Sequence, residues 1–215
     1  MNLAIVLFSG NGNRFCSKID KSLIKIKNSY LFTYPINTLL NNKNIEKIIV
    51  TVNNSNQNFI NTFYKKQIAT KKIEIIKGSN KSRQHSINKA IKYLKNILKK
   101  NDIIITLDGD RPFINNEIIN KSIGVSKKHN AAITVIKNYD SILKINNECK
   151  YINRDEIYLV QTPQSFKYKI WKETNKSNTD FFSSIKYKIT NKNLIFGSRK
   201  NFKITTVDDL QLLKI

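Results

Sequence analysis

The chain has 215 residues, of which 40% are hydrophobic, and this length suits one domain with a well-buried core. Its net charge of +23 would suit a nucleic-acid partner. However, the lysines are spread along the chain, without a block of like charge or an arginine-rich arm, so we interpret them mainly as solvated surface. The two cysteines and two histidines exclude a disulfide framework and a zinc site, and the apolar start is too short for a signal peptide or a membrane span. We therefore expect a cytoplasmic protein with no membrane and no specific nucleic-acid partner.

Short apolar runs alternate with helical patterns along the chain. Between residues 82 and 99, Ile87, Ala90, Ile91 and Leu94 recur at the spacing of an amphipathic helix. This alternation predicts an α/β fold with a mostly parallel sheet, which binds ligands at the carboxyl ends of its strands. Strands are predicted at residues 3–8, 47–52, 72–76, 102–107 and 131–136.

The pattern changes after residue 131. Short β-like pieces at 141–145, 149–152 and 156–160 predict an antiparallel excursion in place of another strand–helix unit. The last helix is predicted to start at Thr206, with Asp209 completing a capping box. No repeat or linker divides the chain, so we expect a single domain over residues 1–215 with 137–160 as a protruding β-arm.

Arginine is rare in this lysine-rich chain and occurs mostly in loop-like contexts beside glycine or proline. Its planar fork binds phosphate with two parallel hydrogen bonds, whereas lysine acts as a point charge. The distribution favours a phosphate-handling enzyme, although loops collect glycine in any case. The arginines are Arg14, Arg83, Arg111, Arg154 and Arg199.

The segment 5–14 runs from an apolar strand into a loop that contains Gly10, Gly12 and Arg14. Backbone N–H groups in such a turn form a cradle for anions, and glycine allows close approach. The segment is neither a P-loop nor a complete dinucleotide fingerprint. On its own, a purely structural turn explains it equally well.

Six segments together, in their order along the chain, resemble a known family. The last two long motifs are the most specific, and the resemblance spans the whole chain. The family is that of the cytidylyltransferases that act on small phosphorylated polyols, namely the methylerythritol-phosphate cytidylyltransferases of isoprenoid synthesis and the ribitol-5-phosphate cytidylyltransferases. The segments are 10–14 with Lys21, 78–88, 108–113, 161–166, Thr179-Asp180 and 201–210.

The resemblance implies a Rossmann-like nucleotidyltransferase fold with a mixed, mostly parallel sheet and a β-arm that dimerises. In the family reaction, a substrate phosphate oxygen attacks the α-phosphorus of CTP and releases pyrophosphate, with Mg²⁺ as cofactor. Because this nucleophile is already ionised at neutral pH, catalysis reduces to positioning and charge neutralisation. We therefore expect a homodimeric enzyme whose ligands are CTP and a phosphorylated polyol.

The same resemblance implies roles for individual residues. The catalytic residues are Arg14, Lys21 and Lys203. The nucleotide-binding residues are Phe8, Ser9, Gly10, Asn11, Gly12, Gly78, Ser79, Arg83, Ser86 and Asp108, of which Asp108 also supports the metal. The substrate-binding residues are Arg111, Asp140, Ser141, Arg154 and Thr162, with Asp140, Ser141 and Arg154 acting in the partner's site.

Several positions depart from the family pattern. Phe8 replaces an alanine and is expected to narrow the space near the nucleotide, and Asp20 places an anion beside Lys21. Asp110 adds a carboxylate that is open to three interpretations: a metal ligand, a solvated loop acid or a partner of Arg111. The loop at Gly78 is one residue longer than the loop that contacts the cytosine base in the family. A purely structural interpretation is also open, in which the loop is the first turn of the next helix and is capped by Ser82 or Ser86.

Tyr158 stands where the methylerythritol branch more usually carries tryptophan, which gives a slight lean to ribitol 5-phosphate as acceptor. Three other functions stay open. These are the same fold with another nucleotide or acceptor, a basic nucleic-acid-binding protein, and a degenerate homologue without activity.

Overall fold

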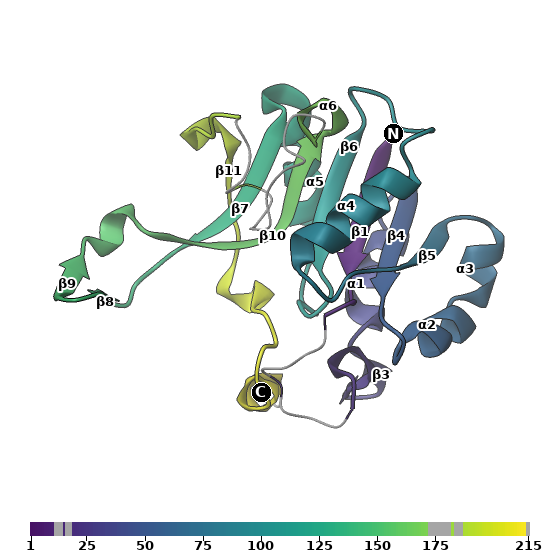
Figure 1. Ribbon diagram of the computed structural model, residues 1–215, viewed down its shortest axis with the longest axis horizontal. Helices are drawn as coiled ribbons and strands as arrows, with labels where there is room; N and C mark the ends of the chain where they lie inside the picture. The colour runs from purple at the N-terminus through teal and green to yellow at the C-terminus, as the bar shows by residue number, and fades with distance from the viewer. Residues whose placement is uncertain (11–14, 16–18, 172–181, 183–186, 214–215) are drawn as a thin grey trace.

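The computed structural model describes residues 1–10, 15, 19–171, 182 and 187–213. Within these residues, seven strands form a central sheet in the order β11–β7–β10–β6–β1–β4–β5 (Figure 1). Paired strands run parallel except at β10, which is antiparallel to β6 and β7. The strands are β1 (Asn2–Leu7), β4 (Lys47–Val52), β5 (Ile73–Lys77), β6 (Ile103–Asp108), β7 (Ala131–Lys137), β10 (Tyr158–Lys167) and β11 (Leu194–Phe196).

The predicted α/β class and its mixed, mostly parallel sheet are confirmed. Each predicted strand agrees with β1, β4, β5, β6 or β7 to within about one residue at each end. The agreement has a simple cause: an interior parallel strand is covered on both faces and reads as an unbroken apolar run, as the fully buried β6 does.

Helices cover both faces of the sheet, and β1 contributes to two cores because its side chains alternate. Ala4 and Val6 pack in one core beneath α1, α2 and α5, whereas Leu3 and Ile5 pack in the other beneath α4 and α6. In Figure 1, α4 crosses the near face of the sheet. The α-helices are α1 (Thr33–Leu40), α2 (Gln57–Phe63), α3 (Lys65–Ala69), α4 (Arg83–Tyr93), α5 (Asn116–His129) and α6 (Tyr168–Trp171).

The helix predicted from residue 82 is α4, and the Ser82 hydroxyl caps it by accepting from His85 N at 3.2 Å. The helix ends at Tyr93, earlier than the apolar spacing indicates, and turns then carry Leu94 and Leu98 into the core. The final helix is a 3₁₀ helix, η7 (Asp208–Leu213), preceded by amides of Thr205 and Thr206 that both donate to Asp209.

Three short 3₁₀ turns and a small hairpin complete the body of the protein in its described part. The hairpin pairs β2 with β3 next to the first turn, η2. Their bounds are β2 (Lys25–Ile26), β3 (Ser29–Tyr30), η2 (Lys21–Leu23), η5 (Asn191–Asn193) and η6 (Arg199–Asn201).

The segment expected to form a β-arm contains a hairpin of β8 (Ile142–Ile145) and β9 (Cys149–Ile152), followed by the turn η3 (Arg154–Glu156). The third β-like piece is the beginning of β10, which continues into the central sheet. The hairpin projects away from the sheet (Figure 1), and most of its residues are exposed. Across the described residues, no helix combines the length and apolarity that a membrane span requires.

Candidate functional site

A cavity of about 340 Å³ lies where the chain leaves the carboxyl ends of β1 and β6. This volume is within the range of small-molecule sites, and the position is the one that parallel sheets use for ligands. A second cavity of about 780 Å³ adjoins it, shares Ser9, Asp20, Ser79 and Asn80, and adds Lys77, Lys81 and Lys89. The first cavity is lined by Leu7, Phe8, Ser9, Gly10, Asp20, Lys21, Ser22, Leu31, Ser79, Asn80, Ser82, Arg83, Ser86, Asp108, Asp110, Lys203 and Thr205.

Asp108 ends β6 and is surrounded by basic groups. Its Oδ1 accepts from Arg83 Nε at 2.9 Å, while Oδ2 lies 3.4 Å from Arg111 Nε and 3.3 Å from Lys203 Nζ. Burial alone would raise the pKa of Asp108, but the charges of Arg83, Lys203 and Arg111 outweigh burial and hold that pKa well below its usual range. The carboxylate therefore stays ionised and draws these cations together at the cavity.

Lys21 is held at the cavity by the short turn η2. Asp20 caps this turn, because its Oδ1 accepts from Ser22 N at 2.9 Å, and its Oδ2 accepts from Asn53 Nδ2 at 2.6 Å. Asn56 Nδ2 donates to Phe8 O at 2.9 Å and to Ser22 Oγ at 3.0 Å, which joins the turn to the end of β1. The anion that the sequence places beside Lys21 is thus a structural cap.

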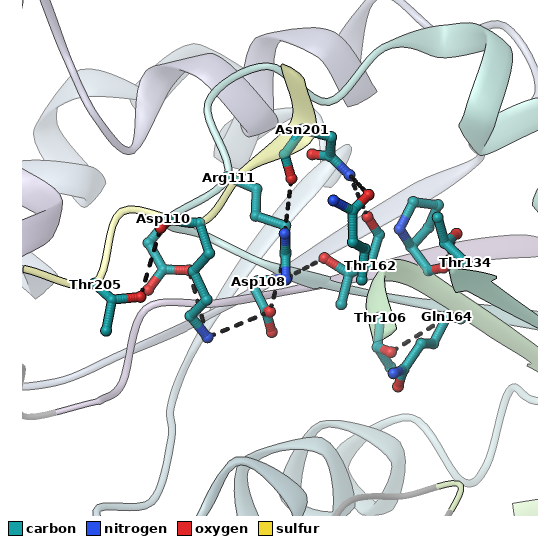
Figure 2. Close-up of polar contacts among 12 residues, drawn as sticks. Thr106, Asp108, Asp110, Arg111, Thr134, Thr162, Gln164, Asn201 and Thr205 are labelled. Carbon is teal, nitrogen blue, oxygen red and sulfur yellow. Dashed lines mark hydrogen bonds and ion pairs between the residues drawn. The ribbon is translucent and has the colours of Figure 1, made fainter. Parts of the chain in front are cut away.

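The structure excludes two of the three interpretations of Asp110, a solvated loop acid and a partner of Arg111. Its side chain is 15% exposed, so it is not a solvated loop acid, and among the described residues its ion-pair partners are Lys21 and Lys203 instead of Arg111. Figure 2 shows Asp110 on one side of Asp108 and Thr162 on the other. Sequence spacing could not reveal this pairing, because it joins segments far apart in the chain.

Phe8 lines the cavity and packs against the loop that follows β6. A Cβ placed on Gly109 would lie 2.2 Å from Phe8 Cε1, so the ring occupies the space that a side chain at position 109 would need. Phe8 is 6% exposed and also lines the cavity. The glycine at position 109 therefore leaves room for the ring of Phe8.

The loop at Gly78 is fixed by buried hydroxyl groups. The Ser86 hydroxyl lies 2.8 Å from Ser9 Oγ and accepts from Ser79 N at 2.9 Å. A Cβ on Gly78 would lie 2.2 Å from Ser9 Cβ, so this loop approaches the end of β1 closely. Ser9, Ser79 and Ser86 line the first cavity, and Gly78 lines the second. A role of Ser86 at a base edge stays a prediction.

Arg111 and Thr162 lie behind the cavity and do not line it. Arg111 NH1 donates to Asn201 O at 2.7 Å, and Thr162 Oγ1 accepts from Asp108 N at 3.1 Å. Asn201 Nδ2 donates to Thr162 O at 2.8 Å, as Figure 2 shows. Sequence reasoning did not assign a role to Asn201, although it begins a motif that the resemblance includes.

Three further predicted residues that the structure describes do not line the cavity. Asp140, Ser141 and Arg154 belong to the β-arm, where Arg154 NH1 donates to Tyr139 O at 2.9 Å and Asn138 Nδ2 donates to Asp140 O at 2.5 Å. The predictions for Asn11, Gly12, Arg14, Thr179 and Asp180 concern positions outside the described residues.

The acidic residues of the cavity fit a metal ion only in part. In the described portion of the chain, no group of three or more His, Cys, Asp or Glu side chains is arranged to hold a metal. Mg²⁺ often uses one or two carboxylates together with substrate phosphates and water. Asp108 lines the cavity at the end of β6, and the low pKa of its carboxyl group keeps it ionised and able to bind a hard cation. This donor set fits a Mg²⁺ ion that arrives with phosphate groups.

Comparison with known proteins gives full-length matches. The model of the family 2-C-methyl-D-erythritol 4-phosphate cytidylyltransferase matches residues 2–215. A protein of that name from Thermosipho africanus is 34% identical over 232 residues, which cover 100% of this chain and 97% of that protein. One from Thermosipho melanesiensis is 32% identical over 224 residues, with the same coverage of 100% and 97%.

A solved structure, 4-diphosphocytidyl-2C-methyl-D-erythritol synthase from Anaerococcus prevotii, has the same fold. It matches with a TM-score of 0.75 and 24% identity, over 99% of this chain and 94% of the other. The Thermosipho relatives carry the methylerythritol name, so they give no support to the slight lean towards ribitol 5-phosphate. The chain belongs to the 2-C-methyl-D-erythritol 4-phosphate cytidylyltransferase family, and it is a cytidylyltransferase.

Proposed function

We propose that this enzyme transfers the cytidylyl group of CTP to 2-C-methyl-D-erythritol 4-phosphate. The printed names of its relatives support this acceptor, with identities of 34% and 32% over the full chain. The observation that carries the proposal is the group of cations that line the first cavity, Lys21, Arg83 and Lys203. The second cavity adjoins it and is large enough for the rest of a nucleotide.

In the proposed reaction, an oxygen of the acceptor phosphate forms a bond to the α-phosphorus of CTP. The bond from that phosphorus to the oxygen bridging to the β-phosphate breaks, and pyrophosphate leaves with the electron pair. The attacking oxygen is ionised at neutral pH, so no side chain has to remove a proton. Lys21, together with Arg14, binds the triphosphate, and Lys203 neutralises the charge that develops on the α-phosphoryl oxygens.

Magnesium would enter with the triphosphate and neutralise part of its charge. Asp108 is the carboxylate that the family resemblance assigns to the ion, and it lines the cavity. The side chains that already surround Asp108 then hold its orientation, with Arg83 Nε at 2.9 Å as the shortest of these contacts in the described structure. The same contacts keep the carboxylate ionised and able to bind a hard cation.

The second part of the proposal is a homodimer in which the β-arm of one subunit covers the site of its partner. Large apolar side chains are exposed on the hairpin, with Ile145 at 71% and Tyr151 at 75% exposure. Exposed apolar surface of this kind is typical of protein interfaces, and most homo-oligomers are two-fold dimers. Asp140, Ser141 and Arg154 would then bind the acceptor in the partner's site.

Pyrophosphate release from CTP and Mg²⁺ tests the reaction and the acceptor together. The acceptors are 2-C-methyl-D-erythritol 4-phosphate, D-ribitol 5-phosphate and glycerol 3-phosphate, and Lys203→Ala serves as the background control. Release with the methylerythritol phosphate alone would support the proposal. Release with ribitol 5-phosphate alone would replace the acceptor. A parallel comparison of CTP with UTP, ATP and GTP tests the base.

A further inference from the structure

Asp110 joins two lysines that come from opposite ends of the chain. Its Oδ2 forms an ion pair with Lys21 Nζ, and its Oδ1 lies 3.7 Å from Lys203 Nζ. The side chain is 15% exposed, and Oδ1 accepts no hydrogen bond in the described structure. Both carboxylate oxygens are therefore directed towards ammonium groups.

One backbone hydrogen bond and one donated by the Lys21 side chain also join these three segments. Ile204 N donates to Asp110 O at 2.9 Å, and Lys21 Nζ donates to Ile204 O at 2.8 Å. The loop after β6, the turn η2 and the segment that carries Lys203 consequently meet at Asp110. The carboxylate cannot move far without disturbing the neighbours on both sides.

Charges alternate along this line of side chains. Asp108 Oδ2 is 3.3 Å from Lys203 Nζ, and Asp110 lies between Lys203 and Lys21. Two ammonium groups this close to one carboxylate would repel each other if the carboxylate were removed. Asp110 thus keeps Lys21 and Lys203 near each other and at defined positions before any substrate binds.

We propose that Asp110 is a positioning residue for cytidylyl transfer, which fixes Lys21 and Lys203 for the transition state and weakens their binding to CTP in the ground state. The inference rests on the proposed roles of these two lysines. A carboxylate competes with the phosphates for both ammonium groups, so it lowers affinity for CTP. Preorganised ammonium groups stabilise the transition state more than mobile ones do, so it also raises kcat.

The test compares Asp110→Asn with the native protein, and Glu117→Gln is the control that removes one negative charge from an exposed ion pair outside the cavity. The dissociation constants of CTP and of pyrophosphate are measured by calorimetry over a series of Mg²⁺ concentrations, and kcat is measured separately. In Asp110→Asn we expect CTP and pyrophosphate to bind about threefold to fivefold more tightly. We expect kcat to fall about tenfold or more, with unchanged dependence on Mg²⁺. Glu117→Gln is expected to match the native protein in each measurement.

A double-substitution cycle shows whether Asp110 acts through its partners. In a Lys203→Ala background, Asp110→Asn is expected to change the affinity for CTP less than it does in the native protein, because part of its effect passes through Lys203. If the lysine variants weaken CTP binding but Asp110→Asn changes neither affinity nor kcat, the inference about Asp110 is wrong on its own. If Lys21→Ala binds CTP normally and Lys203→Ala keeps the native kcat, the proposed roles of the lysines fail first.

Two further results would overturn the inference. Weaker CTP binding in Asp110→Asn, together with a higher Mg²⁺ requirement, would assign Asp110 to the metal ion. A loss of total activity that matches the loss of folded protein, with kcat and affinities per folded molecule unchanged, would make Asp110 a structural residue only.

Discussion

Phe8 and Gly109 pack directly against each other, so the effect of each residue depends on the other. Taken separately, a phenylalanine at the nucleotide loop narrows the site and a glycine after Asp108 loosens the chain. In the structure, the ring of Phe8 lies over Gly109, where a Cβ would be 2.2 Å from Cε1 and 2.4 Å from Cδ1. A sequence comparison that scores each position independently would count two defects where the structure has one packing contact.

We expect Gly109→Ala to lower the free energy of unfolding by about 1–3 kcal/mol, because the added methyl group overlaps a ring that is buried. In a Phe8→Ala background the same substitution should cost clearly less, since the ring is gone. Denaturant unfolding of the two single variants and the double variant measures this coupling. Gly124→Ala is the matched control: a Cβ there meets nothing within 4 Å, and alanine suits its helix. Strictly additive effects of Phe8→Ala and Gly109→Ala would contradict the steric explanation.

Asp108 should make stability depend on pH in a predictable direction. Burial tends to raise its pKa, but the charges of Arg83, Lys203 and Arg111 prevail and lower it. The carboxylate therefore stabilises the fold fully above the unfolded pKa of about 3.9, and this contribution is lost as pH falls from there towards the folded pKa.

The variant Asp108→Asn tests this contribution. It leaves the surrounding cations without a counter-charge and is expected to unfold about 3–5 kcal/mol more easily at pH 7. Thermal unfolding of both proteins from pH 7 to pH 3 should show a difference in Tm that is largest at neutral pH and shrinks below pH 4. A difference that stays constant over this range would mean that Asp108 contributes through packing and not through its charge.

At the scale of elements, the sequence predicted what depends on local pattern. The strands β1, β4, β6 and β7 were found because buried interior strands are nearly continuous apolar runs, and α4 was found because its apolar residues follow the helical period. The end of α4 at Tyr93 and the 3₁₀ form of η7 were missed, since the apolar spacing continues past the point where the backbone changes. The partners of Asp110 could not be predicted, because they depend on how three distant segments meet.

The segment from η5 to Lys203, residues 191–203, is called the C-terminal crossing here. Two buried asparagines hold it, one near each end. Asn193 Nδ2 donates to Ala131 O at 2.8 Å, far from the cavity, whereas Asn201 Nδ2 donates to Thr162 O at 2.8 Å beside it. Asn201 also places its carbonyl oxygen 2.7 Å from Arg111 NH1. The second asparagine therefore links the position of Lys203 to the middle of β10, where Thr162 lies.

We expect Asn201→Ala and Asn193→Ala to destabilise the protein by similar amounts, about 1–3 kcal/mol, because each leaves buried carbonyl groups without a donor. Only Asn201→Ala should also lower kcat, by about tenfold, since it releases the segment that carries Lys203. Unfolding curves and steady-state kinetics on the folded protein separate the two effects. An equal loss of kcat in both variants would show that the crossing affects catalysis through general stability alone.

At the scale of the whole molecule, the excess of positive charge is found on the surface and also in the second cavity of the site. In the first cavity, three carboxylates balance the three cations, whereas in the second cavity Lys77, Lys81 and Lys89 outnumber the single carboxylate of Asp20. An excess of positive charge in a cleft, as in the second cavity, concentrates anionic ligands, and CTP, the acceptor phosphate and pyrophosphate all carry negative charge. The composition that first suggested a nucleic-acid partner is thus compatible with a nucleotide-binding enzyme.

Mixed dimers test whether the β-arm completes the site of the partner subunit. Arg154 lies on the arm and Lys203 lines the cavity, so Arg154→Ala and Lys203→Ala place their lesions in different parts of the molecule. If the arm crosses to the partner, a dimer with one variant subunit of each kind contains one site with both lesions and one site with neither. Random exchange makes about half of the dimers mixed, so activity should recover to about a quarter of the native value per chain.

If the arm serves its own subunit, or if the protein is a monomer, every site keeps one lesion and mixing restores nothing. Each variant alone and a mixture prepared without subunit exchange give the two baselines. Sedimentation of the native protein at the assay concentration reports the oligomeric state separately. Recovery above both baselines can arise only from sites assembled from two chains, since neither variant carries an intact site of its own.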